Sequence, residues 1–208
     1  MLDNNKVILI GYSGHGYVVA DIAIENQLNL IGYTEKNEFV INPFQLNYLG
    51  DEQHDIFFSK YESAEFIIGI GDNYTREEVF NFIKDQGKTI RNLISSSALI
   101  SGSVKMGEGI FVNRNVTINA LAKIGNNVLL NTSCIIEHEC VISDSVHVAP
   151  GAVLAGNVFV GERSIIGANS VIKQGVNIGK DVIIGAGTVV INDIPDGKKI
   201  VGNPSRFL

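Results

Sequence analysis

The chain has 208 residues, of which 45% are hydrophobic and 18% charged, and this balance excludes an intrinsically disordered protein. A formal net charge of −6, with no basic cluster, argues against partners such as nucleic acid or an anionic membrane surface. No apolar run reaches the roughly 18 residues of a membrane span, and two cysteines are too few for a disulfide scaffold. We therefore expect a cytoplasmic protein with one or two domains.

The first 93 residues alternate between strand and helix patterns. Strands are expected at Lys6–Ile10, Leu30–Tyr33, Glu65–Ile70 and Thr89–Leu93. Helices are expected from Tyr17 to about Gln27 and over Thr75–Asp85, with Thr75 at or near the N-cap of the second helix. This alternation predicts an α/β domain with a small, Rossmann-like parallel sheet and right-handed crossovers.

A glycine-rich loop, Gly11-Tyr12-Ser13-Gly14-His15-Gly16, lies between the first expected strand and the first expected helix. Backbone N–H groups at a helix N-terminus can bind phosphate. The order of the glycines, G-x-x-G-x-G, differs from the dinucleotide fingerprint, so NAD binding is disfavoured. His15 favours a ligand, because its imidazole can donate to a phosphate or sugar oxygen. Glycines that serve only a tight turn are the alternative.

From residue 94 onward an aliphatic side chain recurs at every sixth position, and a smaller side chain follows it by four residues. The aliphatic series is Ile94, Ile100, Met106, Val112, Ile118, Ile124, Leu130, Ile136, Ile142, Val148, Leu154, Val160, Ile166, Ile172, Ile178 and Ile184. This period is typical of a parallel β-helix in which three hexads, or about 18 residues, make one coil. Both series should point inward, and the tail after Val190 should cap one end.

The two cysteines, Cys134 and Cys140, fall on the second inward series and are therefore expected in the core. Zinc enzymes built on this kind of helix use three histidine ligands, whereas the repeat region holds only His138 and His147. We expect no metal.

The segment Asn131–Gly161, NTSCIIEHECVISDSVHVAPGAVLAGNVFVG, strongly resembles the bacterial sugar O-/N-acyltransferases of the left-handed β-helix superfamily. Especially similar are the acetyltransferases of nucleotide-linked 4-amino-4,6-dideoxy sugars, including the UDP-sugar enzyme of the bacillosamine pathway, and the sialic acid O-acetyltransferase-like proteins. The resemblance extends to the GYSGHG loop, GIGDN and the GNPSR tail, and so covers nearly the whole chain. It implies left-handed coiling, a homotrimer and acetyl-CoA as co-substrate.

Acetyl transfer from a thioester to an amine needs a base, a donor for the developing oxyanion and aligned substrates. His138 lies at an outward position between Ile136 and Cys140, and a carboxylate beside an imidazole stabilises the charge that comes with the proton. The resemblance makes His138 the base and Glu139 the carboxylate that orients or polarises it. Glu137 is the alternative carboxylate, and an ordinary surface histidine is the alternative interpretation of His138.

The resemblance also implies the substrate contacts. Those with acetyl-CoA are His147 and the backbones of Gly156, Ala168 and Ala186; those with the nucleotide sugar are Ser13, Gly14, His15, Glu35, Lys36 and Gly71. His147 is half a coil from His138, so each site is expected between neighbouring chains of the trimer. Lys198, Lys199 or Arg206 could meet the CoA phosphates. Relatives often carry two acidic residues where this chain has Tyr33-Thr34-Glu35-Lys36, so the nucleobase stays open.

We therefore expect residues 1–93 to bind a nucleotide sugar and residues 94–208 to bind acetyl-CoA and carry the catalytic groups. The expected enzyme is an N-acetyltransferase acting on the amine of a UDP-, dTDP- or GDP-linked 4-amino-4,6-dideoxy sugar in surface glycan biosynthesis. Transfer should be direct, because no serine or cysteine is placed as an activated nucleophile. O-acetylation of a sialic acid or related sugar is one alternative, and a non-catalytic β-helix binding module is another.

Overall fold

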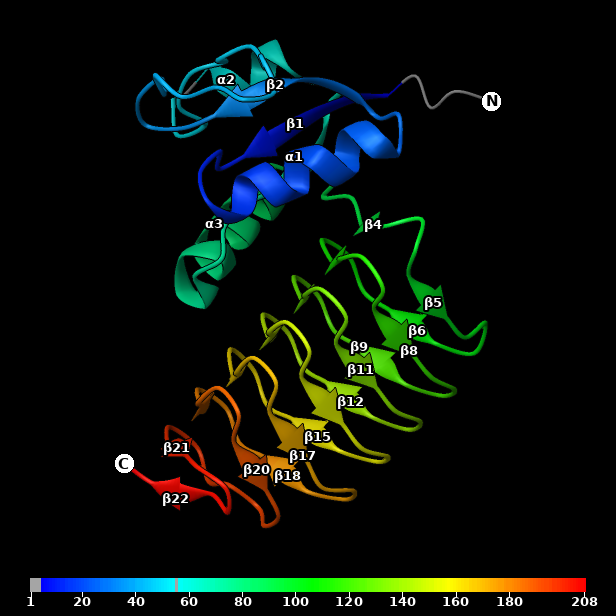
Figure 1. Cartoon of the computed structure of the whole chain (residues 1–208). Coiled ribbons are helices and arrows are strands. Elements are labelled where there is room, and N and C mark those ends of the chain that lie inside the picture. The colour runs from blue at the N-terminus through cyan, green and yellow to red at the C-terminus, as the bar shows by residue number, and fades with distance from the viewer. Residues whose placement is uncertain (1–4, 55) are drawn as a thin grey trace. The chain divides into compact units, whose positions relative to one another are not determined.

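The computed structural model describes residues 5–54 and 56–208, and in it the chain divides into two compact units, Met1–Leu93 and Ile94–Leu208. The N-terminal unit contains a parallel sheet in the order β2-β1-β3 (Figure 1). Its strands are β1 (Lys6–Ile10), β2 (Asn29–Thr34) and β3 (Glu65–Ile68), and its helices are α1 (His15–Glu25), α2 (Phe57–Lys60) and α3 (Asn73–Asp85). The predicted α/β fold class is confirmed for this unit.

Sequence patterns placed most of these elements within a few residues, with three differences. The N-cap of α3 is Asp72 and not Thr75, because the Asp72 side chain accepts from the Thr75 backbone N–H at 2.9 Å. The expected strand at Thr89–Leu93 is reduced to a single parallel bridge between Ile90 and Phe66, and its last residue, Leu93, belongs instead to β4 (Leu93–Ile94). The short helix α2 was not predicted.

One hydrophobic cluster of the N-terminal unit lies between the strands and the helices α2 and α3. Its buried members are Ile8, Ile10, Phe57, Phe58, Ala64, Phe66, Ile68, Val79, Ile83 and Ile90. The two phenylalanines of α2 belong to this core, which explains why so short a helix is stable: tertiary packing, and not helix length, holds it.

The C-terminal unit is a left-handed parallel β-helix whose strands lie on three flat faces. We name each face after one of its strands. The β7 face contains β4 (Leu93–Ile94), β7 (Phe111–Val112), β10 (Leu129–Leu130), β13 (His147–Val148), β16 (Ile165–Ile166) and β19 (Ile183–Ile184). The β5 face contains β5 (Leu99–Ile100), β8 (Thr117–Ile118), β11 (Ile135–Ile136), β14 (Val153–Leu154), β17 (Val171–Ile172) and β20 (Val189–Val190). The β6 face contains β6 (Lys105–Met106), β9 (Lys123–Ile124), β12 (Val141–Ile142), β15 (Phe159–Val160) and β18 (Asn177–Ile178).

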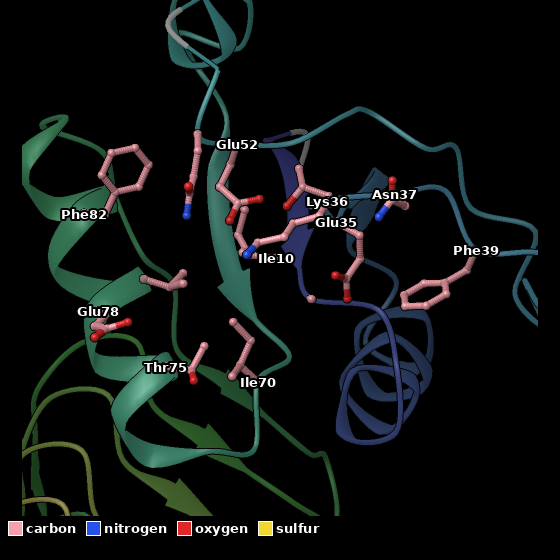
Figure 2. A pocket seen from close by; sticks show the side chains of 14 residues that line it. Ile10, Glu35, Lys36, Asn37, Phe39, Glu52, Ile70, Thr75, Glu78 and Phe82 are labelled. Atoms are coloured by element: carbon pink, nitrogen blue, oxygen red, sulfur yellow. The ribbon is translucent and has the colours of Figure 1, made fainter.

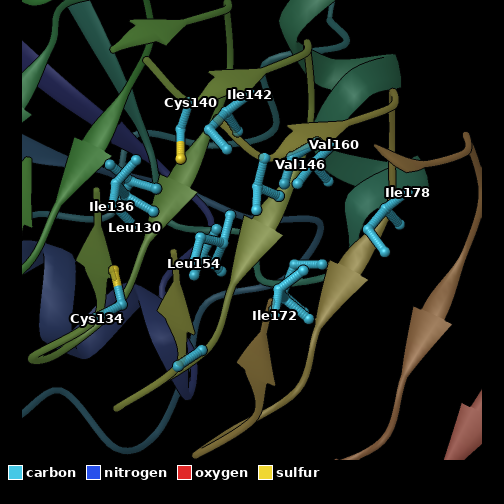
Figure 3. Close-up of a cluster of buried hydrophobic side chains, with 14 of the residues drawn as sticks. Leu130, Cys134, Ile136, Cys140, Ile142, Val146, Leu154, Val160, Ile172 and Ile178 are labelled. Carbon is cyan, nitrogen blue, oxygen red and sulfur yellow. The ribbon is translucent and has the colours of Figure 1, made fainter. Parts of the chain in front are cut away.

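Register in the solenoid follows the predicted coil length. Leu129 pairs with His147 and Ile135 pairs with Val153, so equivalent residues of successive coils are 18 positions apart (147 − 129 = 18). From Ile110 onward both predicted inward series are buried in one continuous core, and their first members, from Ile94 to Met106, are partly buried and pack against it. Cys134 and Cys140 lie among Ile136, Ile142 and Leu154 (Figure 3). The hexad pattern therefore predicted the architecture correctly.

The corners between the faces repeat as regularly as the strands. The turns from the β5 face to the β6 face form the β5–β6 corner, which includes residues 119–122, 137–140 and 155–158. The turns from the β7 face to the β5 face form the β7–β5 corner, which includes residues 149–152, 167–170 and 185–188. Many of these turns contain one residue with positive φ, as at Asn157 (56°) and Asn169 (54°).

The tail meets the last strand of each face. On the β7 face β21 (Lys199–Val201) runs parallel to β19, and β22 (Arg206–Phe207) pairs antiparallel with β21. Ile194 bridges to Ile178 on the β6 face, and the Ser205 N–H donates to the Val189 carbonyl on the β5 face at 3.1 Å. Over the described residues, the helices are too short or too polar for any of them to cross a membrane.

Candidate active site

His138 and Glu139 form a hydrogen-bonded couple on the β5–β6 corner, in the turn between β11 and β12. The His138 Nδ1 and Glu139 Oε2 atoms are 3.1 Å apart, and the two side chains are 50% and 58% exposed. A carboxylate only accepts hydrogen bonds, so Nδ1–H is the donor and Nε2 carries the free lone pair. The accessible nitrogen of the pair can therefore accept a proton from a bound reactant.

Two ladder hydrogen bonds fix the backbone of this turn between its neighbouring coils. The Glu139 N–H donates to the Ala120 carbonyl at 3.0 Å, and the His138 carbonyl accepts from the Asn157 N–H at 2.8 Å. Glu139 has φ 60°, a left-handed conformation that is costly for a residue with a long side chain. The hydrogen bonds between coils thus hold His138 and Glu139 in place, although the Glu139 backbone conformation is unfavourable.

Gly156 lies directly beside the His138 ring, one coil further along the same corner. A Cβ atom at position 156 would come within 2.4 Å of His138 Cε1 and 2.5 Å of Nε2. No real Cβ contact is so short, so the imidazole occupies this position only because residue 156 has no side chain. Ala120, the equivalent residue one coil before His138, is also small.

The other residues expected at acetyl-CoA lie on a different part of the prism. His147 is in β13 on the β7 face, where its Nε2 is 3.5 Å from the Asn131 Nδ2. Ala168 and Ala186 follow at the β7–β5 corner, one above the other, and the Gly187 N–H donates to the Ala168 carbonyl at 2.8 Å. Within one chain, the structure brings Gly156 to His138 but places His147 on the β7 face and the two alanines at the β7–β5 corner.

The glycine loop of the N-terminal unit joins β1 to α1 through very close backbone packing. A Cβ at Gly16 would lie 2.3 Å from the Gly11 carbonyl oxygen, and one at Gly69 would lie 2.4 Å from the same atom. Three glycines therefore serve the packing of α1 onto the sheet. Ser13 and Gly14 are exposed at the start of α1, and these are the loop positions left open to a ligand.

His15 and Gly71 come together at this end of the sheet, since a Cβ at Gly71 would be 3.7 Å from the His15 Cβ. Burial, with a further contribution from the Arg76 guanidinium, lowers the pKa of His15 to about 4, so its imidazole is neutral at pH 7. Arg76 is itself buried and donates to the Gly71 carbonyl at 3.0 Å and to the Asn73 Oδ1 at 2.9 Å. Arg76 thereby holds the GIGDN segment, a role that its sequence position did not suggest.

A pocket of about 720 Å³ lies at the ends of β1, β2 and β3 and against α3 (Figure 2). Glu35 and Lys36, both expected at the nucleotide sugar, line it together with Thr75 and Glu78. The Glu35 Oε1 accepts from the Tyr12 N–H at 2.8 Å, which ties the residues after β2 to the glycine loop. The expected contacts Ser13, Gly14, His15 and Gly71 are not among the pocket's lining residues.

Comparisons with known proteins agree in both units. Residues 6–83 match the family model of the PglD N-terminal domain, and residues 157–191 match that of the hexapeptide repeat of succinyl-transferase. The GDP-perosamine N-acetyltransferase of Caulobacter crescentus, solved with CoA and GDP-perosamine as a mutant with one histidine replaced by alanine, has a TM-score of 0.93 to this chain. It is 31% identical, and the match covers 100% of this chain and 99% of that one.

The chain belongs to the sugar acyltransferases of the hexapeptide-repeat β-helix superfamily.

Two further solved structures support this membership of the acyltransferase family. The acetyltransferase domain of PglB from Neisseria gonorrhoeae, solved with acetyl coenzyme A, is 29% identical at a TM-score of 0.93, over 99% of this chain and 100% of that one. WeeI from Acinetobacter baumannii is 25% identical at a TM-score of 0.86, also over 99% and 100% of the two chains. This family member is an acetyltransferase.

One residue of this acetyltransferase that sequence reasoning missed is Glu52. It lines the pocket beside Lys36 and Glu35, yet is only 8% exposed. Burial raises the pKa of its carboxyl. A buried carboxyl in a pocket is a strong functional signal, but it depends on the fold and leaves no local pattern in the sequence.

The thiols of the acetyltransferase are core groups, as the hexad pattern predicted. Burial raises the pKa of Cys134 to about 12 and also raises that of Cys140, so neither thiol forms a reactive thiolate near neutral pH. Among the described residues, no group of three or more His, Cys, Asp or Glu side chains could hold a metal ion.

Proposed function

We propose that this acetyltransferase moves the acetyl group of acetyl-CoA to the amine of a nucleotide-linked 4-amino-4,6-dideoxy sugar. The amine nitrogen attacks the thioester carbonyl, a C–N bond forms and the C–S bond breaks. His138 Nε2 takes the proton that the attacking amine loses. The imidazolium then gives this proton to the departing CoA thiolate. The products are the amide and the CoA thiol. Direct transfer of this kind needs no acyl-enzyme.

The observation that carries this proposal is the His138–Glu139 couple. Its geometry, with Nδ1 3.1 Å from a carboxylate oxygen and Nε2 accessible, is that of an oriented general base. Glu139 is then the residue that fixes the tautomer and stabilises the imidazolium formed during transfer. Glu137 is the less favoured partner, because the ion pair at His138 is made by Glu139.

Acetyl-CoA is the proposed donor, with His147 and the backbones of Gly156, Ala168 and Ala186 as its contacts. The perosamine enzyme was solved with CoA and the PglB domain with acetyl coenzyme A, which supports the same co-substrate here. Because Gly156 lies at the β5–β6 corner and the other three residues lie on the β7 face and the β7–β5 corner, one CoA molecule would reach both groups across two chains. This is the reason to propose a homotrimer with sites between neighbouring β-helices.

The outer surface of the β5 face supports such an assembly. Its outward positions carry aliphatic side chains in five of six coils: Leu99, Ile135, Val153, Val171 and Val189, with Thr117 completing the column. Leu99 is 69% exposed and Val171 42% exposed in the single chain. A continuous apolar column along a flat face is typical of a surface that is covered in an oligomer.

The acceptor is proposed to bind the N-terminal unit through its nucleoside diphosphate. Exposed Ser13 and Gly14 at the start of α1 can supply backbone donors to a phosphate, and neutral His15 can supply a single N–H. Glu35 and Lys36 line a pocket whose volume suits a nucleoside. The perosamine relative was solved with a GDP-linked amino sugar, and the base used here is a question for experiment.

Transfer to such an acceptor would serve the synthesis of a surface glycan. Two buried, unpaired thiols are consistent with a reducing compartment such as the cytoplasm, where nucleotide sugars are made.

The test is an assay of thiol release and acetylated product with acetyl-CoA and a panel of UDP-, dTDP- and GDP-linked 4-amino sugars plus free sialic acid. We expect rapid turnover of one nucleotide amino sugar, and a loss of at least about 100-fold in kcat in His138→Ala. Turnover of sialic acid alone would replace N-acetylation by O-acetylation. If the protein binds no CoA, and if His138→Ala changes nothing in the assay, the chain would instead be a non-catalytic binding module.

A further inference from the structure

Leu121 is the second unusual residue of the β5–β6 corner. Its φ is 64°, and it is the one aliphatic side chain among the positive-φ residues of ranges 5–54 and 56–208. The equivalent solenoid positions carry glycine or polar residues such as Asn115, Asn127, Ser133, Asn157 and Asn169. A left-handed conformation is costly for an L-residue with a bulky side chain, whereas asparagine and glycine tolerate it.

Hydrophobic burial does not offset this destabilisation, because the Leu121 side chain is 59% exposed to solvent. Leu121 therefore destabilises the fold in two ways: its backbone is left-handed, and its apolar side chain is exposed to water. Strain of this kind in an exposed apolar residue points to a function of the side chain.

Leu121 lies one coil from the catalytic couple. It is 18 residues before Glu139 (139 − 121 = 18), and the carbonyl of the preceding residue, Ala120, accepts the Glu139 N–H at 3.0 Å. Stacked strands of a β-helix are about 4.8 Å apart. The Leu121 and Glu139 side chains thus leave the same corner at neighbouring heights, with His138 beside them.

We infer that Leu121 is a specificity-determining residue that contacts the C6 methyl group of the acceptor sugar. In a 4-amino-4,6-dideoxy hexose, C6 is three bonds from the reacting nitrogen, along N4–C4–C5–C6. When N4 is within hydrogen-bond reach of His138 Nε2, the methyl group lies within about one coil spacing of the base. Leu121 is the exposed apolar side chain in the neighbouring coil of this corner.

This inference rests on the proposed function. It adds that the enzyme selects acceptors with a methyl group at C6. An aliphatic side chain stabilises a methyl group by burying it, and it disfavours a C6 hydroxyl that would lose its water partners. Discrimination of one such group in an apolar site is about tenfold or more. The enzyme should therefore prefer 6-deoxy over 6-hydroxy acceptors.

The experiment compares wild-type protein with Leu121→Asn, which suits a left-handed residue and should keep the fold. The acceptors are the 6-deoxy amino sugar that turns over fastest and its 6-hydroxy counterpart on the same nucleotide. We expect Leu121→Asn to lower kcat/KM for the 6-deoxy acceptor about tenfold and to remove the preference, with an unchanged KM for acetyl-CoA. The variant should also melt at a higher temperature, whereas Asn115→Leu, the reverse change at another corner, should melt lower.

Three results would overturn the assignment while leaving the proposed function intact. These are an undiminished preference in Leu121→Asn, a rise in KM for acetyl-CoA alone, or dissociation of the oligomer in sedimentation, which would place Leu121 in a contact between chains. A wild-type protein that acetylates no amino sugar would overturn the proposed function itself, and the assignment with it.

Discussion

The imidazole of His138 packs against the backbone of Gly156, its equivalent one coil later, so closely that a Cβ there would sit 2.4 Å from the ring. The Nδ1 atom of the same ring is held by the Glu139 carboxylate at 3.1 Å. The position of the proposed base thus depends on a residue that has no functional group of its own.

Replacing Gly156 by alanine should displace the His138 ring and lower kcat about 100-fold, because a shift of about 1 Å in a catalytic group can have that effect. Gly156 does not have a positive φ, so the backbone itself accepts alanine. The melting temperature should therefore change little. Steady-state kinetics and thermal unfolding of the same preparation measure both quantities.

Gly102→Ala is the matched control, since Gly102 occupies the same column of the β5–β6 corner and a Cβ there meets nothing within 4 Å. It should behave as wild type in both measurements. A Gly156→Ala enzyme with full kcat would show that the ring position does not matter for turnover.

Glu139 should show a trade-off between activity and stability. Glu139→Asn suits φ 60° better and should raise the free energy of unfolding by up to about 1 kcal/mol. The same variant should lose at least about tenfold in kcat, because the shorter amide no longer orients the imidazole or stabilises its charge. Denaturant unfolding measures the change in the free energy of unfolding, and initial rates measure the loss in kcat.

Glu137→Gln separates the two candidate carboxylates. It should retain most of the activity, since Glu139 is the residue within ion-pair distance of His138. Loss of activity in Glu137→Gln, together with full activity in Glu139→Gln, would transfer the polarising role to Glu137.

Glu52 should make stability depend on pH. Burial raises its pKa above the usual 4.5, so the folded state holds the proton more tightly than the unfolded state. The stability linked to that proton is present below pH 4.5 and is lost as the pH rises through the folded pKa. Glu52→Gln should therefore melt higher than wild type at pH 8, with the difference shrinking as the pH falls toward 4.5.

Glu78→Gln provides the comparison, because Glu78 lines the same pocket but is exposed. It should leave the melting temperature unchanged at both pH values. An increase at pH 8 as large as that in Glu52→Gln would mean that general charge reduction, and not burial, is responsible.

Val153→Glu should disrupt the assembly. Val153 is at the middle of the outward column of the β5 face, and a charge buried there without a partner costs several kcal/mol. Sedimentation should show smaller species, and activity should fall with them if each site needs two chains. Asn177→Glu, at an exposed outward position of the β6 face, should remain assembled. An intact oligomer in Val153→Glu would exclude the β5 face as the interface.

The hexads made the C-terminal unit unusually easy to predict, because each inward position is set by a local period and the coils repeat it without change. Ile136 and Cys140 were placed in the core correctly, and so was the outward direction of His138. The strands of the N-terminal unit were also found, since β1 and β3 are short apolar runs bounded by polar residues and glycine.

The features that could not be predicted from the sequence depend on contacts between residues far apart in the chain. The closeness of Gly156 to His138 comes from stacking of coils, and the burial of Glu52 comes from packing of the chain after β2. The N-cap at Asp72 was missed because Thr75, three residues later, is also a common capping residue and pairs with it. The expected strand at Thr89–Leu93 shrank to one bridge because its last residue, Leu93, pairs with β7 as part of β4.

The tail gives the β-helix a property that its repeats alone would lack. A parallel β-helix that stopped at β20 would present open backbone N–H and C=O groups on all three faces, ready to receive the first coil of another molecule. Ile194, Ser205 and β21 occupy those groups, and antiparallel β22 gives the last edge a different hydrogen-bond pattern from the parallel ladder beneath it. The tail thus acts as a terminator of polymerisation, and chains that lose it should grow end to end into fibres.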